Sequence, residues 1–515
     1  MIDKAAILHI PCSEYAYPLD EETFCVRLRA GRRNLVCCEL YVADRACETT
    51  PIRFESLPME RIARDERFDF FQAVFPIRHT RICYYFRLQG QEEWTYYYGD
   101  IFTRELADLQ MEGNWVDGRS EYFQYPAILR TEIARPPKWM NTACFYNVFP
   151  DSFADGSEAL AGPAKSGGRL GGTLRGVTEN LEHIARLGCN GLYLNPIFTA
   201  KSYHKYDTID YFKIDQHFGD KETFRQLVKE AHARGMKIML DAVFNHIGYD
   251  SPQWQDVVKH GEDSIYKDWF HIKEFPVSSE NLWNSRDLSY HAFAFAGYMP
   301  KLNTANPEVK AYLLKVATYW IEEFDIDAWR LDVANEIDHQ FWRDFRKAVL
   351  AKKSDLYILG EIWHSSQPWL NGDEFHAVMN YPLSESIKDY FLRGHKETQR
   401  FIWEINSQSM YYRQQISEVM FNLLDSHDTE RILTTAKGDL QSVKSALAFL
   451  YLQRGTPCIY YGTELALIGG PDPDCRRVMP WERVSSDNDM LNFMKNLIQL
   501  RKEVAGIIQH GNVSL

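Results

Sequence analysis

The sequence predicts an α/β protein in which a (β/α)8 TIM barrel follows an N-terminal β-sandwich domain. The first 125 residues hold short β-branched and aromatic runs between turn signals such as Gly31 and Gly90, the spacing of a β-sandwich. From residue 141 to 505, eight strand-like runs alternate with amphipathic helical stretches, which indicates a closed parallel barrel. A doubly wound open sheet is the alternative, but it needs a glycine-rich loop where this chain has NVFPDSFADG (147–156).

The N-terminal domain, residues 1–125, is predicted from four β-rich runs. These runs are 24–29, 36–42, 68–75 and 82–88. Residues 126–140 follow and include the segment RPPKW (135–139). Because a proline disfavours helical backbone in the residue before it, we expect 126–140 to be an extended linker.

The second domain, residues 141–505, is predicted to contain eight strands and at least six helices. The strands are 143–149, 191–195, 237–244, 326–333, 356–361, 377–380, 419–424 and 458–461. The helices are 178–187, 221–234, 307–323, 338–351, 440–451 and 487–503. After the third strand, residues 247–302 form a loop-like insertion with little helical period. A connection of this length inside a compact domain is usually functional.

Composition excludes several classes of partner. The net charge is −13, and no long Lys/Arg run exists, which argues against nucleic acid and anionic membranes. No apolar run reaches roughly 18 residues, so no membrane span is predicted. The N-terminus, MIDKAAILHIPCSEY, lacks the apolar stretch and cleavage site of a signal peptide. The ten cysteines include no C-x-x-C pair, which favours free thiols and a cytoplasmic location.

Three acidic residues each end a separate apolar run: Asp332 in AWRLDVANE, Glu361 in YILGEIWH and Asp428 in FNLLDSHDT. Active sites of (β/α)8 barrels lie at the carboxyl ends of the strands. Carboxylates buried near one another are costly unless chemistry uses them. Two of them about 5–5.5 Å apart would make a retaining glycosidase, with the third bracing a distorted sugar. For each residue alone, a buried structural carboxylate is the alternative.

Residues near these carboxylates suggest their charge states. Arg330 and Asp332 are two apart on a strand and therefore point the same way. We expect Arg330 to lower the pKa of Asp332 and keep it ionised, with a structural Arg–Asp pair as the alternative. Apolar neighbours of Glu361 favour the protonated carboxyl that a general acid needs. His246 and His427, at two further strand ends, suit sugar hydroxyls, although either alone could be a core histidine.

Longer motifs around these residues resemble the α-amylase superfamily. Four segments are similar to its signature regions: DAVFNH (241–246), WRLDVANE (329–336), GEIWH (360–364) and LLDSHDTER (423–431). MPKLN (299–303) resembles a further motif of its neopullulanase and oligo-1,6-glucosidase branches. Three segments resemble the neopullulanase, cyclomaltodextrinase and maltogenic amylase group more narrowly: VANE, HKYDTIDYFKID (204–215) and GGPDPDCRR (469–477). The resemblance extends from the N-terminal β-domain to about residue 505.

The resemblance implies Asp332 as nucleophile, Glu361 as general acid/base and Asp428 as stabiliser of the transition state. It also implies substrate-binding roles for seven residues: Tyr206 (under the attacked ring), His246, Arg330, Trp363, His427, Asp472 and Arg476. The implied substrates are small α-glucans. The N-terminal domain resembles the starch-binding-like domain through which this group forms homodimers.

One departure from the family concerns calcium. Relatives bind calcium near 153–173, but Thr173 stands in place of an Asp there. Asp155, Ser157 and Glu158 supply too few oxygens, because hard cations need six or more. We therefore expect no metal and no other cofactor.

Two other departures are noted. Relatives carry a C-terminal β-sandwich, of which residues 506–515 would be only the start, so we expect a truncated chain with an exposed apolar barrel flank. Asp425 stands where many relatives have Gly, near enough to Asp428 to perturb it.

The leading hypothesis is a retaining hydrolase of α-1,4 bonds in cyclomaltodextrins, pullulan and short maltodextrins, with transglycosylation as a side activity. An oligo-1,6-glucosidase-like exo-enzyme is an alternative, against which the N-terminal domain and VANE argue. A non-catalytic barrel relative would be expected to lack acidic residues at these three positions. A folded but inactive truncated fragment is the remaining alternative.

Overall fold

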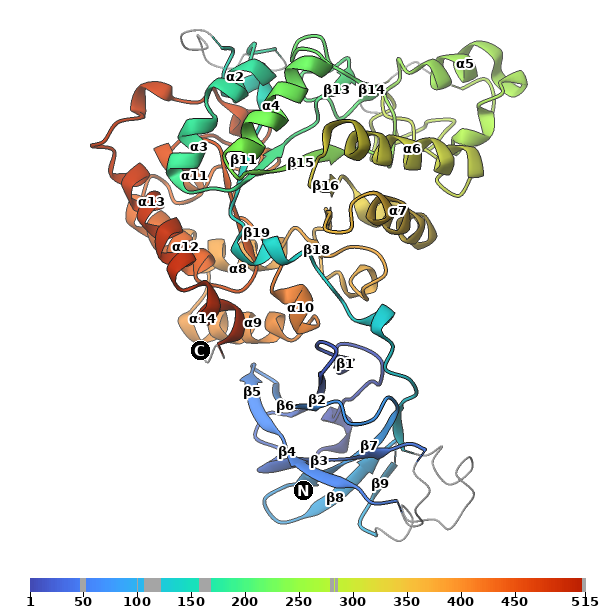
Figure 1. Cartoon of the computed structure of the whole chain (residues 1–515), viewed down its shortest axis with the longest axis vertical. Coiled ribbons are helices and arrows are strands. Elements are labelled where there is room, and N and C mark those ends of the chain that lie inside the picture. The colour runs from blue at the N-terminus through green and yellow to red at the C-terminus, as the bar shows by residue number, and fades with distance from the viewer. Residues whose placement is uncertain are drawn as a thin grey trace. The chain divides into compact units, whose positions relative to one another are not determined.

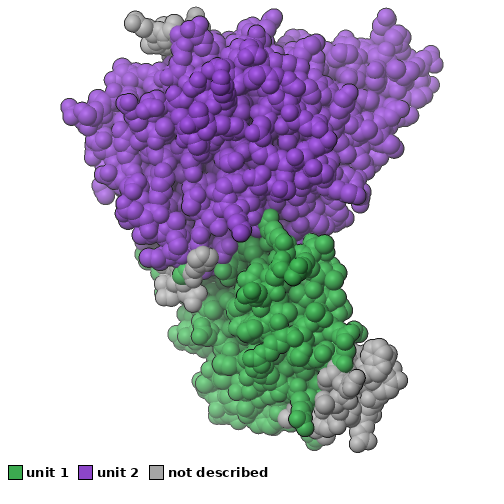
Figure 2. Space-filling view, in the orientation of Figure 1, with its two compact units in different colours: residues 1–135, 396–417, 510–515 green, residues 136–395, 418–509 purple. Residues whose placement is uncertain are grey.

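The computed structural model describes residues 1–46, 52–99, 101–105, 122–156, 168–277, 282 and 286–511. The chain divides into two compact units (Figures 1 and 2). Unit 1 comprises Met1–Arg135, Lys396–Ser417 and His510–Leu515, and unit 2 comprises Pro136–His395 and Glu418–Gln509.

Unit 1 contains two antiparallel sheets that enclose one apolar core. The first sheet has the order β1 (Ala16–Pro18), β2 (Thr23–Gly31), β6 (Phe68–Pro76), β5 (Glu60–Arg64). The second has the order β4 (Glu55–Pro58), β3 (Cys37–Asp44), β7 (Ile82–Gln89), β8 (Trp94–Tyr98), β9 (Ile101–Thr103), with β10 (Phe123–Tyr125) also on β7. Alternate residues such as Val26, Leu28, Leu40, Phe86 and Leu88 are buried between the sheets. The predicted β-sandwich is confirmed.

A helical segment distant in sequence also belongs to unit 1. Helices α9 (Thr398–Ser409) and α10 (Gln414–Ser417) lie in the chain between the sixth and seventh barrel strands. The Asn406 side-chain amide donates to the Arg64 carbonyl at 2.9 Å, and the Arg32 guanidinium lies 4.8 Å from the Trp403 ring centre. The sequence did not predict these helices.

Unit 2 is built on eight parallel strands in the order β18-β17-β16-β15-β12-β11-β20-β19. Their bounds are β11 Phe145–Val148, β12 Gly191–Leu194, β15 Lys237–Ala242, β16 Ala328–Leu331, β17 Tyr357–Gly360, β18 Ala377–Val378, β19 Phe421–Asn422 and β20 Thr456–Tyr460. A parallel bridge between Met379 and Phe421 joins the two outer strands. The predicted (β/α)8 barrel is therefore confirmed, and each strand overlaps one predicted from the sequence.

Helices surround the barrel, and most of them follow the predicted pattern. They are α2 Leu174–Glu179, α3 Leu181–Leu187, α4 Lys221–Ala233, α6 Pro307–Phe324, α7 His339–Lys352, α8 Tyr381–Ile387, α12 Leu440–Tyr451, α13 Asp489–Glu503 and α14 Ala505–His510. Helix α6 shows how the sequence sets where a helix begins. Asn306 caps its first N–H groups, and Pro307 occupies its first turn. Its buried stripe includes Val309, Leu313 and Trp320.

Three sequence predictions of local structure were wrong. The single helix predicted over 178–187 is two helices, because the chain leaves helical geometry at Asn180. The insertion 247–302 contains helix α5 (Pro252–His260), which Ser251 caps and which buries Trp254. The linker contains 3-10 turns, Arg130–Glu132 and Lys138–Thr142, since the Met140 N–H bonds to the Pro137 carbonyl.

Over the part of the chain that the structure describes, no helix combines the length and apolar character needed to cross a bilayer.

Candidate active site

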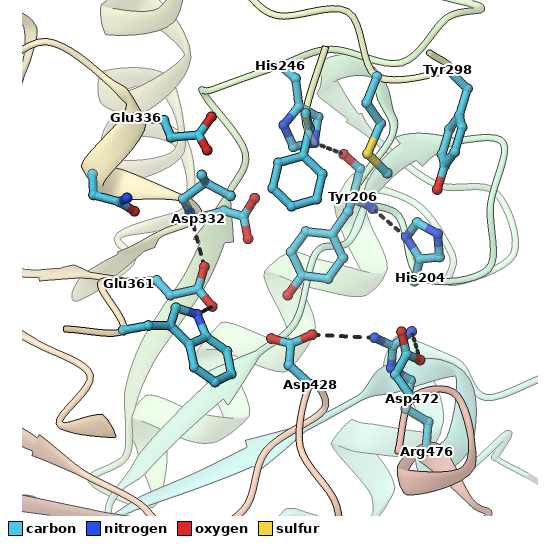
Figure 3. Close-up of a pocket in the computed structure, with 15 residues that line it drawn as sticks. His204, Tyr206, His246, Tyr298, Asp332, Glu336, Glu361, Asp428, Asp472 and Arg476 are labelled. Atoms are coloured by element: carbon cyan, nitrogen blue, oxygen red, sulfur yellow. Dashed lines mark hydrogen bonds and ion pairs between the residues drawn. The ribbon is translucent and has the colours of Figure 1, made fainter. Parts of the chain in front are cut away.

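A pocket of about 460 Å³ opens at the carboxyl end of the barrel strands (Figure 3). Eight predicted site residues line it: Tyr206, His246, Asp332, Glu361, Trp363, Asp428, Asp472 and Arg476. The other two, Arg330 and His427, are fully buried beside it. Seven lining residues were missed: His204, Phe293, Tyr298, Met299, Val333, Asn335 and Glu336. Several of these belong to motifs quoted above, so position within a motif was the available signal.

Strand pairing positions the first two carboxylates. The Asp332 N–H donates to the Ala242 carbonyl at 3.0 Å, and the Glu361 N–H donates to the Leu331 carbonyl at 2.9 Å. Each residue is thus held in register with the preceding barrel strand. Val333 follows with φ of 46°, a strained conformation for a β-branched residue. This turn directs the Val333 N–H to Glu361 Oε2 at 3.1 Å.

Arg330 is the central cation of the site. Its Nη1 lies 2.8 Å from both Asp241 Oδ1 and Asp332 Oδ1, and its Nη2 lies 2.7 Å from Glu361 Oε1. The prediction that Arg330 and Asp332 point the same way is confirmed. One guanidinium therefore carries the counter-charge for three carboxylates in a site largely closed to water.

This sharing reverses the predicted direction of the pKa shift of Asp332. Burial raises the pKa of Asp332 well above its ordinary value; Arg330 opposes this, and the nearby Glu361, Asp241 and Asp428 add to it. We predicted that Arg330 would hold Asp332 ionised. Arg330 does lower the pKa of Asp332, but the net shift is upward, because a single positive charge divided among three carboxylates does not offset the burial of Asp332.

The surroundings of Glu361 also differ from the prediction. The expected apolar wall is incomplete, because the carboxylate accepts a hydrogen bond from the Trp363 indole N–H at 3.2 Å in addition to its contacts with Val333 and Arg330. The Trp363 ring stacks on Tyr381 with centres 3.8 Å apart and is 49% exposed. An exposed ring held flat in this way is a ready surface for a sugar.

Asp428 has the opposite shift to Asp332. Burial alone would raise the pKa of Asp428, but His427, Arg330 and Arg476 outweigh it and lower the pKa below its ordinary range. His427 Nε2 lies 2.9 Å from Asp428 Oδ2, and Arg476 Nη2 lies 3.5 Å from Asp428 Oδ1. Environments that push two carboxyls apart in this way are typical of sites that use acids and bases together.

The two predicted histidines occupy different places. His246 lines the pocket; burial lowers its pKa to about 3, so its ring is neutral near pH 7. His427 lies beneath the surface, where Nε2 is 2.5 Å from the Tyr206 hydroxyl and Nδ1 is 2.9 Å from the Asn195 amide nitrogen. The Tyr206 and His427 rings are nearly parallel, with centres 5.5 Å apart.

Asp425 does not line the pocket. Its carboxylate accepts hydrogen bonds from the Thr463 hydroxyl at 2.9 Å and the Ile432 N–H at 3.3 Å. Burial raises the pKa of Asp425. Asp425 thus joins the start of helix α11 (Ile432–Thr435) to the segment after β20, and none of these hydrogen bonds involves Asp428.

The described residues near the expected calcium loop bond to one another and to nearby backbone. The Thr173 hydroxyl donates to the Asp155 carbonyl and accepts from the Gly176 N–H, both at 3.0 Å. Asp151 accepts from the Leu170 and Gly171 N–H groups. Ser157 and Glu158 lie outside the described residues, within which no cluster of metal-ligating side chains occurs.

We therefore predict that EDTA leaves both activity and melting temperature unchanged, because hydrogen bonds from Thr173 to the Ala154 and Asp155 carbonyls hold this part of the chain without a metal. Activity assays and melting curves with and without added calcium test this. A drop of several degrees that calcium restores would contradict it.

Comparisons with known proteins extend these observations. The chain matches the models for the alpha amylase catalytic domain over residues 147–505 and the alpha amylase N-terminal ig-like domain over residues 1–128. The intracellular maltogenic amylase of Bacillus subtilis is 46% identical over 523 residues, covering 99% of this chain and 86% of that protein. Neopullulanase 2 of Thermoactinomyces vulgaris is 42% identical over 520 residues, again covering 99% and 86%. A solved cyclomaltodextrinase structure, 41% identical, matches with a TM-score of 0.92 over 99% of this chain and 86% of that one.

Proposed function

The chain belongs to the alpha-amylase family, and we propose that its pocket cleaves α-1,4 bonds of small α-glucans with retention of configuration. It is an α-glucan hydrolase, as its relatives are. The observation that carries the mechanism is the bridge of Arg330 between Asp332 and Glu361. One guanidinium that contacts both carboxyls holds them near one another, and in retaining enzymes the two catalytic carboxyls are typically roughly 5–5.5 Å apart.

In the first step, Asp332 attacks the anomeric carbon as a carboxylate, the form that its contact with Arg330 favours against the effect of burial, while Glu361 donates its proton to the departing glycosidic oxygen. The bond to the leaving sugar breaks, and a glycosyl ester of Asp332 forms. In the second step, Glu361 takes a proton from water, the hydroxide adds to the same carbon, and Asp332 leaves as a carboxylate. A sugar hydroxyl in place of water gives transglycosylation.

Asp428 and the aromatic residues stabilise the reacting ring in this proposal. The lowered pKa of Asp428 keeps it ionised opposite the oxocarbenium-like charge. Tyr206 provides a ring face for the attacked sugar, and Arg476 ties Asp428 to Asp472 through ion pairs at 3.5 and 3.0 Å. Trp363 would receive the leaving sugar, because its indole contacts the proposed acid Glu361.

The preferred substrates in this proposal are cyclomaltodextrins, pullulan and short maltodextrins. The names of the cyclomaltodextrinase, neopullulanase and maltogenic amylase relatives support this range. We further propose a homodimer formed through the N-terminal β-domain and, from the name of the Bacillus subtilis relative, a cytoplasmic location. Sedimentation velocity, with and without residues 1–125, would test the dimer.

A rate comparison on β-cyclodextrin, pullulan, soluble starch and isomaltose tests the substrate class. We expect kcat/KM to be highest for β-cyclodextrin, lower for soluble starch and negligible for isomaltose. Preference for isomaltose would instead identify an exo-acting 1,6-glucosidase. Inactivity on all four substrates would overturn the proposed function.

A further inference from the structure

A pair of buried thiols lies at the amino ends of the first two barrel strands. Cys144 directly precedes β11, and Cys189 lies between α3 and β12. Their Sγ atoms are 3.6 Å apart, and the two residues are only 2% and 3% exposed. Both are free thiols. The proposed catalysis does not use this pair, because the pocket opens at the opposite, carboxyl end of the strands.

Backbone hydrogen bonds hold the two cysteines on adjacent parallel strands. The Cys144 carbonyl accepts from the Asn190 and Gly191 N–H groups at 3.0 and 3.1 Å, and the Cys144 N–H donates to Asn190 Oδ1 at 2.8 Å. The next residue, Phe145, pairs with Gly191 in the parallel ladder. Adjacent strands are about 4.7–4.9 Å apart, which falls in the range of about 4.4–6.8 Å that a disulfide spans between Cα atoms. The two sulfur atoms can therefore be joined with little movement of the backbone.

The surroundings of the two sulfur atoms give them different roles. Contact with Cys189 is the largest influence on the Cys144 thiol and lowers its pKa; burial opposes this, and the positive charge of Arg501 adds to it. Burial raises the pKa of Cys189 well above its ordinary value, and Cys144 raises it further. The Cys189 S–H is therefore the donor to the Cys144 sulfur. Because the thiolate is the reactive form of cysteine, Cys144 is the nucleophile of the pair.

We propose that Cys144 and Cys189 are a reversible redox site, which a hydroperoxide oxidises to a disulfide that fastens β11 to β12. With hydrogen peroxide, the Cys144 thiolate attacks one oxygen and the O–O bond breaks, which gives a sulfenic acid and hydroxide. The Cys189 sulfur then attacks the Cys144 sulfur, the S–O bond breaks, and the Cys189 proton leaves with the departing oxygen as water. Overall, two thiols lose two electrons and two protons, and one peroxide becomes two waters.

The disulfide would act on stability and leave catalysis unchanged. Cys144 and Cys189 are 45 residues apart in the chain, and a link across a loop of this length restricts the unfolded state. The link would lie at the end of the barrel that is typically concerned with stability, whereas the active site occupies the other end. Disulfides of cytosolic proteins are usually transient and sense oxidants, which fits a pair that reopens when reductant returns.

Oxidation of the whole folded protein tests the proposal. The protein is treated with hydrogen peroxide in native buffer, the remaining thiols are alkylated in denaturant, and the peptides are mapped by mass spectrometry. We expect a linked Cys144–Cys189 peptide and a melting temperature roughly 3–8 °C above that of the reduced protein. Dithiothreitol should reverse both changes, and the rate on β-cyclodextrin should be the same before and after oxidation.

Two variants sharpen the test. Cys189→Ala should give no linked peptide and no rise in melting temperature after oxidation. The matched control is Cys458→Ala, because Cys458 is a third buried thiol, on β20, which also pairs with β11, and its thiol donates to the Ile459 carbonyl at 3.8 Å. Cys458→Ala should respond to peroxide as the parent does.

Several outcomes would overturn the proposal. They are a link between Cys144 and Cys458, a link that forms only in denaturant, and a linked protein whose melting temperature is not raised. Oxidation of the exposed Cys12 and Cys37 without any Cys144–Cys189 link would overturn it as well. The peptide map of the unsubstituted protein gives these answers whether or not either variant folds.

Discussion

Replacing Asp332 with Asn abolishes turnover of β-cyclodextrin and raises the melting temperature at neutral pH. The loss, about 10⁴-fold or more in kcat, follows because an amide cannot form the covalent intermediate. The gain in stability follows from charge: burial raises the pKa of Asp332, so its ionised form is unfavourable in the folded state. We expect the free energy of unfolding to rise by about 1–2 kcal/mol.

The pH dependence of this gain has a definite sign. A carboxyl whose folded pKa is raised contributes stability below its unfolded pKa, and that contribution disappears as pH rises through the folded value. Asp332→Asn should therefore gain most near pH 7 and little near pH 4. Melting curves at both values measure it, and a lower melting temperature at pH 7 would contradict the charge argument.

Asp327→Asn is the matched control at the other end of the same strand. Burial alone would raise the pKa of Asp327, but His232, Lys237 and Lys353 outweigh this effect and lower the pKa. Its stability contribution is present at neutral pH and is lost on acidification. The substitution should lower the melting temperature at pH 7 while the folded enzyme stays active.

Turnover by Asp332→Asn within tenfold of the parent would refute the nucleophile assignment.

Replacing Arg330 with Met costs about 3–5 kcal/mol of stability near pH 7 and also removes activity. The guanidinium is fully buried and contacts Asp241, Asp332 and Glu361. Without it, three carboxylates lose their shared counter-charge, and a buried charge without its partner is strongly destabilising. Their protonated forms become favoured in the folded state, so the deficit should shrink as pH falls toward 4.

Denaturant unfolding at several pH values measures this effect. Arg175→Met is the control, because Arg175 is 74% exposed and pairs with Glu179 across one helical turn. That change should cost no more than about 0.5 kcal/mol. A deficit in Arg330→Met that is equal at pH 4 and pH 7 would contradict the charge account.

The sequence by itself was sufficient for the architecture and the family. Apolar runs that stop at Asp332 and Glu361 predict two buried strands and also the ends of those strands that carry the active site. Barrel active sites lie at the carboxyl ends of the strands, and buried carboxylates are typical of functional sites. The eight strands and the family are confirmed. The roles of Asp332, Glu361 and Asp428 stay predictions that the described geometry supports.

Tertiary structure alone decided which side chains meet and what charge they carry. Neighbours in sequence suggested that Arg330 would keep Asp332 ionised, but Asp241 and Glu361, brought in by adjacent strands, share the same guanidinium. Residues 398–417 likewise pack with the N-terminal sheets, a non-local contact that no local pattern encodes. The sequence determined periodicity and residue type, which are local properties. Burial and electrostatic balance depend on every group within a few ångströms, and only the folded chain brings those groups together.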